Sequence, residues 1–341
     1  MEVKILKSEN DLWEDYVQRS PVATNYHQSG WRGVIEKSFG HETYYLMAIA
    51  GGTARGILPL AHMRSRLFGN FLVSLPFFNY GGIIADDSET VEKLISSAVE
   101  IAKELGADHI EFRHLYNKLP VGQTREHKVT MILDLKGDID SQWKAFNAKL
   151  RNQIRKAEKS GLQIKIGGLE DIPGFYEVFA ENMRDLGTPV YGRAFFQNVF
   201  TSFPESARVF SVIFQDKVIA SGIASWFKDT FEVPWASSIR EYRALCPNNL
   251  LYWEAIKFAI ENGFKKFDFG RSTPGEGTYK FKEQWGAGPV QLYWQYWMKD
   301  GRSLPELNPK NPRYQLAIKV WQRLPVALTK ILGPRIVRNI P

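Results

Sequence analysis

The sequence has little cysteine and histidine, which narrows the chemistry that it can perform. Its 341 residues include one cysteine, Cys246, and six histidines. One cysteine excludes an intramolecular disulfide and a multi-cysteine metal site, which fits a reducing compartment. The histidines form no H-x-x-x-H or H-E-x-x-H pair, so we expect no bound metal. The sequence also lacks a Gly-x-Ser-x-Gly elbow, a P-loop and a strand-linked G-x-G-x-x-G, and so does not indicate a serine hydrolase or a dinucleotide-binding enzyme.

Long uncharged segments are also scarce. The longest, residues 67–85, covers 19 residues but contains three glycines, two asparagines and a proline. This composition suits a pair of buried strands better than a membrane span. The amino terminus, MEVKILKSENDLWEDY, is polar from its start and lacks the apolar core of a secretory signal. We therefore expect a cytoplasmic protein, in which 44% apolar residues are enough for the packed cores of two domains.

The segment from Asn248 to Trp285 is the most informative part of the chain. It begins with apolar residues at helical spacing, reaches a helix stop at Asn262-Gly263, and continues with the strand pattern Phe267-Asp268-Phe269. Residues 270–277 contain three glycines and a proline and extend neither pattern. A loop that leaves the end of a sheet strand commonly carries binding groups on a rigid scaffold, so we expect the chemistry here.

The same helix and strand pattern occurs 157 residues earlier. Placing Leu94 on Leu251 aligns the two segments without a gap. The aligned pairs are Ala98 with Ala255, Ala102 with Ala259, Glu104 with Glu261, Gly106 with Gly263, Glu111 with Asp268 and Phe112 with Phe269. Each half also begins with an extended stretch and contains a hairpin pattern, over residues 45–63 and 209–227. This spacing suits two copies of one domain in tandem.

We therefore predict an α+β fold with mixed α/β sheets in two domains, residues 1–140 and 141–300, followed by a tail at 301–341. The tail accounts for the whole net charge of +7, because it holds seven basic and no acidic residues from Leu307 onward. Its apolar residues follow one helical face, and a second apolar stretch ends at Gly333-Pro334. A basic amphipathic helix can bind an anionic leaflet. Alternatively, its apolar face packs on the first domain, and the two arrangements are compatible.

A second basic cluster begins the second half. Residues 144–165 hold seven cations against Glu158 alone, on a helix that ends at Gly161. Arg151 and Arg155 are four residues apart and share one side of that helix. Guanidinium groups match phosphate oxygens, so these two side chains are candidates for phosphate contact beside a cleft between the domains. The alternative is an ordinary solvated surface.

Four motifs resemble the FemAB family. They are R-N-x-I-R-K-A-E-K-x-G-L from Arg151, N-N-L-L-Y-W from Asn248, F-D-F-G-R-S from Phe267 and Y-K-F-K-E-Q-W-G-A from Tyr279. Members of that family have two GNAT-like domains and transfer aminoacyl groups from aminoacyl-tRNA to an amine of a peptidoglycan precursor. The first half is similar to FemAB-like proteins associated with exosortase (PEP-CTERM) and exopolysaccharide gene clusters, in motifs that begin at His27, Lys37, Leu58, Arg64 and Asn79.

The resemblance implies roles for individual residues. Lys282 matches the lysine after phenylalanine that the family is thought to use against developing negative charge or substrate phosphate, and we expect Lys280 and Arg271 to assist it. Asp268 is the candidate proton acceptor, although it could instead pair with a neighbouring cation. Candidates for substrate binding, besides Arg151 and Arg155, are Asn248 with the helix start behind it, Tyr279 as a stacking or core residue, and Tyr80 as a cleft residue of the first half.

Two departures from the family pattern concern the acyl donor. The chain lacks a long charged helical hairpin, which some members use for tRNA. It also lacks the R-x-x-G-x-G turn with which ordinary GNAT enzymes hold the pyrophosphate of coenzyme A; the corresponding place reads R-A-L-C-P-N from Arg243. Aminoacyl-tRNA and acyl-CoA therefore both remain candidate donors. We expect either one to be a substrate, with no bound cofactor.

The leading hypothesis is an N-acyltransferase, aminoacyl in type, acting on a nucleotide- or lipid-linked precursor of peptidoglycan or exopolysaccharide. A second is an acyl-CoA-dependent N-acyltransferase of an amino sugar in exopolysaccharide synthesis. A third, from another class, is a non-catalytic binding protein at the membrane surface. Sequence-specific DNA binding is not expected, because the chain without its tail is neutral. We expect the protein in the cytoplasm, with peripheral contact at the inner face of the membrane through the tail.

Overall fold

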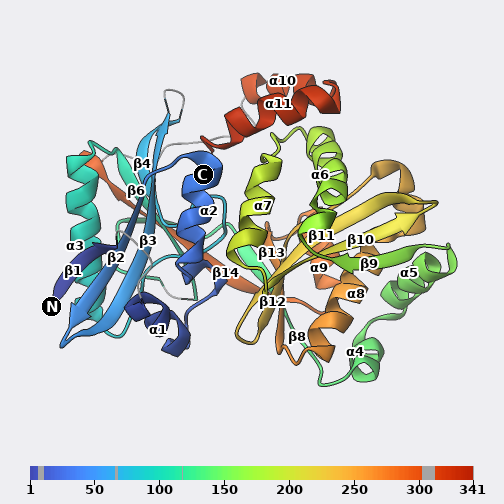
Figure 1. The fold of residues 1–341 in the computed structure, drawn as a ribbon, viewed down its shortest axis with the longest axis horizontal. Coiled ribbons are helices and arrows are strands. Elements are labelled where there is room, and N and C mark those ends of the chain that lie inside the picture. The colour runs from blue at the N-terminus through green and yellow to red at the C-terminus, as the bar shows by residue number, and fades with distance from the viewer. Residues whose placement is uncertain (7–10, 66–67, 117, 302–311, 341) are drawn as a thin grey trace. The chain divides into compact units, whose positions relative to one another are not determined.

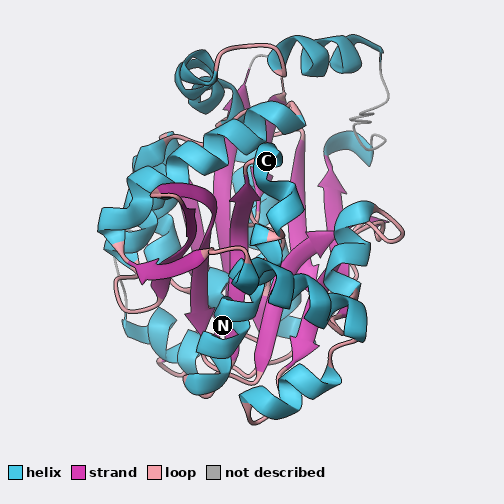
Figure 2. Cartoon of the chain, turned by 90° about the vertical axis from the view of Figure 1, so that its right-hand side faces the viewer, coloured by secondary structure: helices cyan, strands magenta, loops and turns pink. Residues whose placement is uncertain are grey.

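The computed structural model describes residues 1–6, 11–65, 68–116, 118–301 and 312–340. For residues 312–314 it describes the backbone alone. Strands and helices joined by short loops make up most of this chain (Figure 2). The chain divides into two compact units. Unit 1 contains residues 1–129, 290–301 and 338–340 of the described chain, and unit 2 contains 130–289 and 312–337.

Unit 1 is built on a mixed sheet. Its strand order is β1 (Glu2–Leu6), β2 (Thr43–Ala50), β3 (Thr53–Ser65), β4 (Gly69–Val73), β6 (His109–Leu115) and β14 (Gly288–Met298). All neighbours are antiparallel except β4 and β6, which run parallel. The short strands β5 (Ile84–Ala85) and β7 (Gln123–Arg125) pair with β3 and β14.

Helices cover both faces of the sheet of unit 1. The helices are α1 (Asp11–Arg19), α2 (Gly30–Phe39) and α3 (Ser88–Glu104) (Figure 1). Leu46 of β2 lies in the core with Leu94 of α3. The next residue along the strand, Tyr45, stacks on Trp13 of α1 with 5.0 Å between ring centroids. Because neighbouring strand residues point to opposite faces, α3 and α1 lie on opposite sides of the sheet.

Unit 2 has a sheet of the same design. Its order is β9 (Gln163–Gly167), β10 (Ala207–Phe214), β11 (Lys217–Phe227), β12 (Thr230–Ser238), β13 (Lys266–Ser272) and β8 (Val129–Asp134). The first four are antiparallel, and β12 and β13 are parallel. Its helices are α4 (Ile139–Ala145), α5 (Ala148–Lys159), α6 (Ile172–Leu186), α7 (Arg193–Ser202), α8 (Pro247–Glu261) and α9 (Gly277–Glu283).

Aromatic residues fill both faces of the sheet of unit 2. Phe231 of β12 and Phe267 of β13 stack with centroids 5.5 Å apart, and Phe258 of α8 lies 5.8 Å from Phe231. On the other face, Trp235 contacts Phe196 of α7 at 5.5 Å. The parallel pair β12 and β13 is therefore held between α8 and α7.

The internal repeat predicted from the sequence is confirmed. Helix α3 precedes β6 in unit 1 as α8 precedes β13 in unit 2, and the aligned residues Leu94 and Leu251 are both fully buried. The units differ from the predicted ranges 1–140 and 141–300 in their last strands. Strand β8 belongs to unit 2 almost from its first residue, and β14, which follows unit 2 in sequence, completes the sheet of unit 1.

The tail forms two helices, α10 (Pro312–Trp321) and α11 (Val326–Val337). The expected stop at Gly333-Pro334 is wrong, because α11 continues through Pro334 to Val337. Its buried stripe continues as well, through Thr329, Gly333 and Val337 at intervals of four residues. Helix α11 packs on α6 of unit 2, and residues 338–340 after it belong to unit 1. Packing of the tail's apolar face on the first half stays a prediction. Lys310, one of the seven basic residues of the tail, lies outside the described residues. No helix of the described chain has both the length and the apolar character needed to cross a bilayer.

Candidate active site

The two parallel strands of unit 2 pair briefly and then separate. Three residues of β12 pair with three of β13, and the last pair is Glu232 with Asp268. Beyond this point β13 runs to Ser272 without further pairing to β12. A fork between parallel strands exposes backbone groups that no ladder uses, and such a place can hold an extended ligand. We call this place the unit 2 fork.

Asp268 lies buried at the base of the unit 2 fork. Its Oδ1 accepts hydrogen bonds from Thr130 Oγ1 at 2.6 Å and from Gly270 N at 2.7 Å. The second bond requires the backbone to turn back sharply, and Gly270 permits this with a φ of +77°. The carboxylate is thus fixed by its own strand and by β8. It was predicted as a proton acceptor, and it lies at the centre of the buried run Phe267-Asp268-Phe269 of β13, two residues before Gly270.

Lys282 is the buried cation next to this carboxylate. It lies on α9, and its Nζ donates to Gly270 O and Arg271 O, both at 2.9 Å. Burial lowers the pKa of Lys282 to about 8. The nearby Asp268 carboxylate opposes this shift, whereas the Arg271 guanidinium lowers the pKa further. An ammonium group has three N–H donors, and these carbonyls take two of them. One donor therefore remains for a ligand.

The other residues predicted around Lys282 have different surroundings. Arg271 supplies a backbone carbonyl to Lys282, while its side chain is exposed. Lys280 is exposed and lies on the far side of α9 from Lys282, because two helical residues are about 200° apart. Tyr279 is half-buried. Trp285 is almost fully buried against Phe146, at 5.3 Å between centroids, and belongs to the core.

Helix α5 carries the two predicted phosphate ligands. Asn147 at its start donates to Gln284 O after α9, and Gln153 accepts from Asn249 of α8, so the helix spans from α9 to the start of α8. Arg151 lies between these two contacts, and its buried Nε has no hydrogen-bond partner among the described residues. Arg155 is exposed and lies over the Trp143 ring at 5.4 Å.

The start of α8 offers fewer anion donors than predicted. Pro247 has no N–H, and the N–H groups of Asn249 and Leu250 bond to Cys246 O at 3.0 and 3.4 Å. Asn248 itself is half-buried, and its Oδ1 is buried without a hydrogen-bond partner among the described residues. Since unpartnered buried polar atoms are rare in folded proteins, Arg151 and Asn248 mark the contact of α5 with α8 as a candidate ligand-binding region.

Glu232 and Thr130 were missed by sequence reasoning. Glu232 is buried and lies opposite Asp268 on the neighbouring strand, so its side chain points to the same face of the sheet. Its sequence signal is the same as that of Asp268, an acid between two apolar strand residues. Thr130 gave no such signal, because only the fold brings β8 beside β13. Among the described residues, no group of three or more histidine, cysteine or acidic side chains could hold a metal ion.

The corresponding fork of unit 1 is filled by a buried ion pair. Strands β4 and β6 also pair over three residues, and the last pair is Val73 with Glu111. Arg113 Nε donates to Glu111 Oε1 at 2.8 Å, and Arg113 Nη1 donates to Phe78 O at 2.6 Å. Its guanidinium also lies 4.4 Å from the Trp294 ring. The aligned position in unit 2 is Gly270, so the duplicated forks now differ: one is closed by an arginine and the other holds Lys282.

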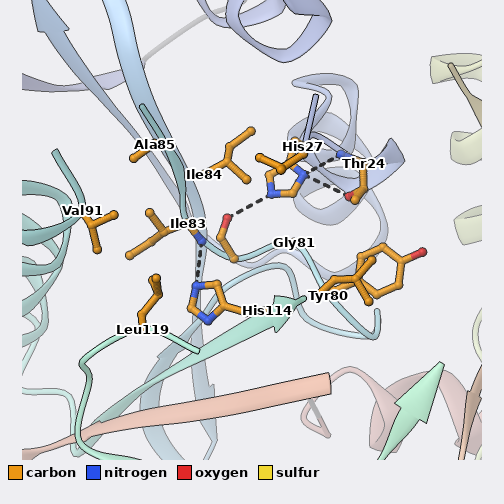
Figure 3. Close-up of a pocket in the computed structure, with 13 residues that line it drawn as sticks. Thr24, His27, Tyr80, Gly81, Ile83, Ile84, Ala85, Val91, His114 and Leu119 are labelled. Carbon is orange, nitrogen blue, oxygen red and sulfur yellow. Dashed lines mark hydrogen bonds between the residues drawn. The ribbon is translucent and has the colours of Figure 1, made fainter. Parts of the chain in front are cut away.

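Unit 1 contains a small cavity beside the loop that follows β4, and Tyr80 lines it (Figure 3). Its volume is about 100 Å³. His27 Nδ1 accepts from Thr24 N at 3.0 Å, so its Nε2 carries the proton and donates to Gly82 O at 3.1 Å. The cavity thus has one neutral imidazole in its wall. Tyr80 is placed in this cavity of unit 1, and its role at a cleft between the halves stays a prediction.

The second histidine of the cavity is also neutral. His114 Nε2 accepts a hydrogen bond from Ile83 N at 3.1 Å (Figure 3). Burial, followed by the nearby His27, lowers the pKa of His114 to about 3. With two neutral imidazoles and no charged side chain in its lining, the cavity suits a small neutral group rather than a phosphate.

Comparison with known proteins finds a family match in the second half of the chain. Residues 144–283 match the family model "Acetyltransferase (GNAT) domain", which covers both α5 and the unit 2 fork. A curated relative, the Lipid II:glycine glycyltransferase of Staphylococcus haemolyticus, is 30% identical over 97 residues. That match covers 28% of this chain and 23% of the relative, so the chain spans about a quarter of the length of the relative.

Solved structures show the fold over nearly the whole chain. The structure of FemX has a TM-score of 0.69 at 15% identity and covers 93% of this chain and 100% of its own. L-PGS from Bacillus licheniformis has a TM-score of 0.57 at 12% identity, covering 93% and 98%. A tandem GNAT protein from the clavulanic acid biosynthesis pathway has a TM-score of 0.57 at 12% identity, covering 89% and 99%. The predicted FemAB-like fold is therefore confirmed: the chain folds as two tandem GNAT domains.

Proposed function

We propose that the protein is an N-acyltransferase, aminoacyl in its leading form, which makes an amide on an amine of a cell-envelope precursor. The observation that carries this proposal is Lys282, a buried ammonium group held at the unit 2 fork beside Asp268. It lies in the part of the chain that matches an acetyltransferase domain. The partial match to a glycyltransferase named for Lipid II supports a precursor of peptidoglycan, or of a related exopolysaccharide, as acceptor.

Amide formation needs no nucleophile from the protein, because the acceptor amine is the nucleophile. It needs a group that stabilises the negative charge on the carbonyl oxygen. The neutral amine of the acceptor attacks the carbonyl carbon of an activated ester, a C–N bond forms, and negative charge develops on the carbonyl oxygen. The remaining N–H of Lys282 stabilises that oxygen. The ester C–O bond then breaks, and the proton lost by the amine passes to the leaving oxygen. The charge of Asp268 raises the pKa of Lys282 and so favours its charged form, and Asp268 is the carboxylate that relays this proton in the proposal.

The acceptor is held by the basic face of α5. Arg151, with its unpartnered Nε, and the exposed Arg155 present guanidinium groups on one side of the helix. Such groups match the phosphates of a nucleotide- or lipid-linked precursor.

Aminoacyl-tRNA is the leading donor and acyl-CoA is the second candidate. The match to an acetyltransferase domain favours acyl-CoA. Against it, the start of α8 has a proline and two N–H groups already bonded to Cys246 O, so it lacks the cradle of free N–H groups that a pyrophosphate needs. With acyl-CoA as donor, the same amide chemistry would modify an amino sugar during exopolysaccharide synthesis.

A transfer assay with matched donors tests the proposal. The purified protein is incubated with a UDP-linked muropeptide and either aminoacyl-tRNA carrying labelled glycine or labelled acetyl-CoA, and the labelled amide is measured. We expect label from the tRNA donor, lost by roughly 100-fold or more in Lys282→Met. Transfer from acetyl-CoA alone would support the second candidate. If neither donor supports transfer while a UDP-linked or lipid-linked precursor raises the Tm, the protein is a non-catalytic binding protein.

The proposed location follows from the substrate. A nucleotide-linked precursor is cytoplasmic and a lipid-linked precursor lies at the inner face of the cytoplasmic membrane, so the protein acts in the cytoplasm with access to that face. Specific DNA is not a partner in this proposal, since the positive net charge is confined to the tail.

A further inference from the structure

The two C-terminal helices are firmly attached to unit 2 by one face. Gly333 of α11 lies so close to Val190 that a Cβ added there would be 2.8 Å from Val190 N. Arg184 Nη1 of α6 donates to Leu324 O at 3.2 Å, and Gln322 Nε2 donates to Asp185 O at 3.0 Å. These contacts fix the opposite faces of both helices as an outer surface.

That outer surface combines exposed aliphatic and basic side chains. On α10 and just after it, Leu316, Lys319, Val320 and Arg323 follow the i, i+3, i+4, i+7 spacing of one helical face. Leu316 is 65% exposed and Val320 is 53% exposed. On α11, Leu328, Ile331 and Arg335 follow the same kind of spacing, and Ile331 is 61% exposed. We call these seven residues the tail surface.

The tail surface has no opposing charge within its own helices. The sequence has no acidic residue from Leu307 to its end. Lys330 is paired with Glu177 of α6. The side chains of Lys319, Arg323 and Arg335 are exposed. Among the described residues, four large apolar side chains have more than half of their surface exposed: Leu316, Val320 and Ile331 of the tail surface, and Leu186 at the end of α6. Such a concentration of apolar surface, flanked by cations, is typical of an interaction site.

We propose that the tail surface binds the surface of an anionic phospholipid bilayer. The cations attract the negatively charged headgroups, and the aliphatic side chains enter the boundary between headgroups and acyl chains. A second copy of this chain fits less well, because a symmetric contact would bring two purely basic surfaces together. Nucleic acid fits less well because binding to its phosphates makes no use of exposed leucine and isoleucine. The proposal is independent of the transfer reaction.

Vesicle binding by the full chain tests this proposal. The protein is sedimented with vesicles of phosphatidylglycerol and phosphatidylcholine, and with vesicles of phosphatidylcholine alone. We expect binding to the first kind only, weakened by added salt because screening reduces the attraction. The triple variant K319Q, R323Q and R335Q should bind roughly 100-fold more weakly, since each cation near such a surface contributes about a factor of five.

Two further variants separate charge from apolar contact. The variant L316S, V320S and I331S keeps every cation and should bind at least roughly tenfold more weakly. A control, K37Q, K93Q and K103Q, removes three exposed cations of unit 1 and should bind like the native chain. Absence of binding to the anionic vesicles, or an equal loss in the control, overturns the proposal. All variants should keep full transfer activity on a soluble precursor, so failure of the membrane proposal is distinguishable from failure of the proposed function.

Discussion

At the scale of single residues, the site depends on one buried cation. Burying an ammonium group is unfavourable, and the structure offsets this with two carbonyls, from Gly270 and Arg271, and with the charge of Asp268. Its pKa falls from 10.5 to about 8 rather than further, so Lys282 is mostly charged near neutral pH. A cation in a poorly solvated place stabilises an oxyanion more strongly than one in water.

The first prediction is a loss of activity at high pH. Because the pKa of Lys282 is about 8, the ammonium form disappears above that pH, and kcat should fall. Replacing Lys282 by arginine keeps a charge throughout this range, so the variant should be slower but should lose the fall near pH 8. The pH profile of kcat under saturating substrate measures both. A fall near pH 8 that persists in K282R would assign it to another group.

The second prediction concerns Asp268. An asparagine there can still accept both hydrogen bonds, from Thr130 Oγ1 and Gly270 N, through its Oδ1. It removes the charge that raises the pKa of Lys282, so the high-pH fall in kcat should move to lower pH in D268N. The Tm should change little, because the geometry is kept. An unchanged pH profile would show that the carboxylate does not act through Lys282.

At the scale of elements, most helices and strands could be predicted because their signals are local. Asn262-Gly263 was expected to stop the helix and does so, since Gly263 has a φ of +79° and α8 ends at Glu261. The two hairpins were likewise expected from alternating patterns and are confirmed as β2 with β3 and β10 with β11. The short helix α9 was not predicted. Its start at Gly277, inside a glycine-rich loop, depends on tertiary contacts such as the burial of Lys282 and Trp285.

The third prediction compares two glycines of unit 1, Gly82 in the loop before β5 and Gly33 in α2. Gly82 passes so close to β6 that an added Cβ would lie 2.5 Å from His114 Cδ2 and 2.6 Å from Arg113 O. G82A should therefore lower the free energy of unfolding by roughly 1–3 kcal/mol. Gly33 lies in α2 with nothing within 4 Å of such a Cβ, and G33A should raise the free energy by roughly 0.5–1 kcal/mol. Urea unfolding of both variants measures the difference, and equal effects would contradict it.

At the scale of the whole molecule, the sequence could predict the duplication but not how the units are completed. The repeat is visible because Leu94 and Leu251 begin the same buried pattern. The placement of β8 and β14 could not be predicted from the sequence, because the pattern of an apolar strand does not specify which sheet the strand joins. The site was only partly predictable. Lys282 and Asp268 could be predicted together because they lie in one sequence segment. Thr130 could not be predicted, because it reaches Asp268 only through the fold.

The last prediction concerns the duplication. Replacing the buried cation by methionine should mainly reduce stability at the unit 1 fork and mainly reduce transfer at the unit 2 fork. R113M leaves Glu111 buried without its ion partner and should cost about 3–5 kcal/mol of stability. K282M removes a cation that burial disfavours, and Asp268 keeps its hydrogen bonds from Thr130 Oγ1 and Gly270 N, so K282M should cost less stability than R113M and abolish most transfer. The stability comparison uses thermal unfolding at pH 7. The double variant E111L and R113M should recover much of the lost stability, because neutral replacements of a buried pair are often tolerated. A large loss of Tm in K282M, with R113M unaffected, would reverse these roles and place the structural ion pair in unit 2.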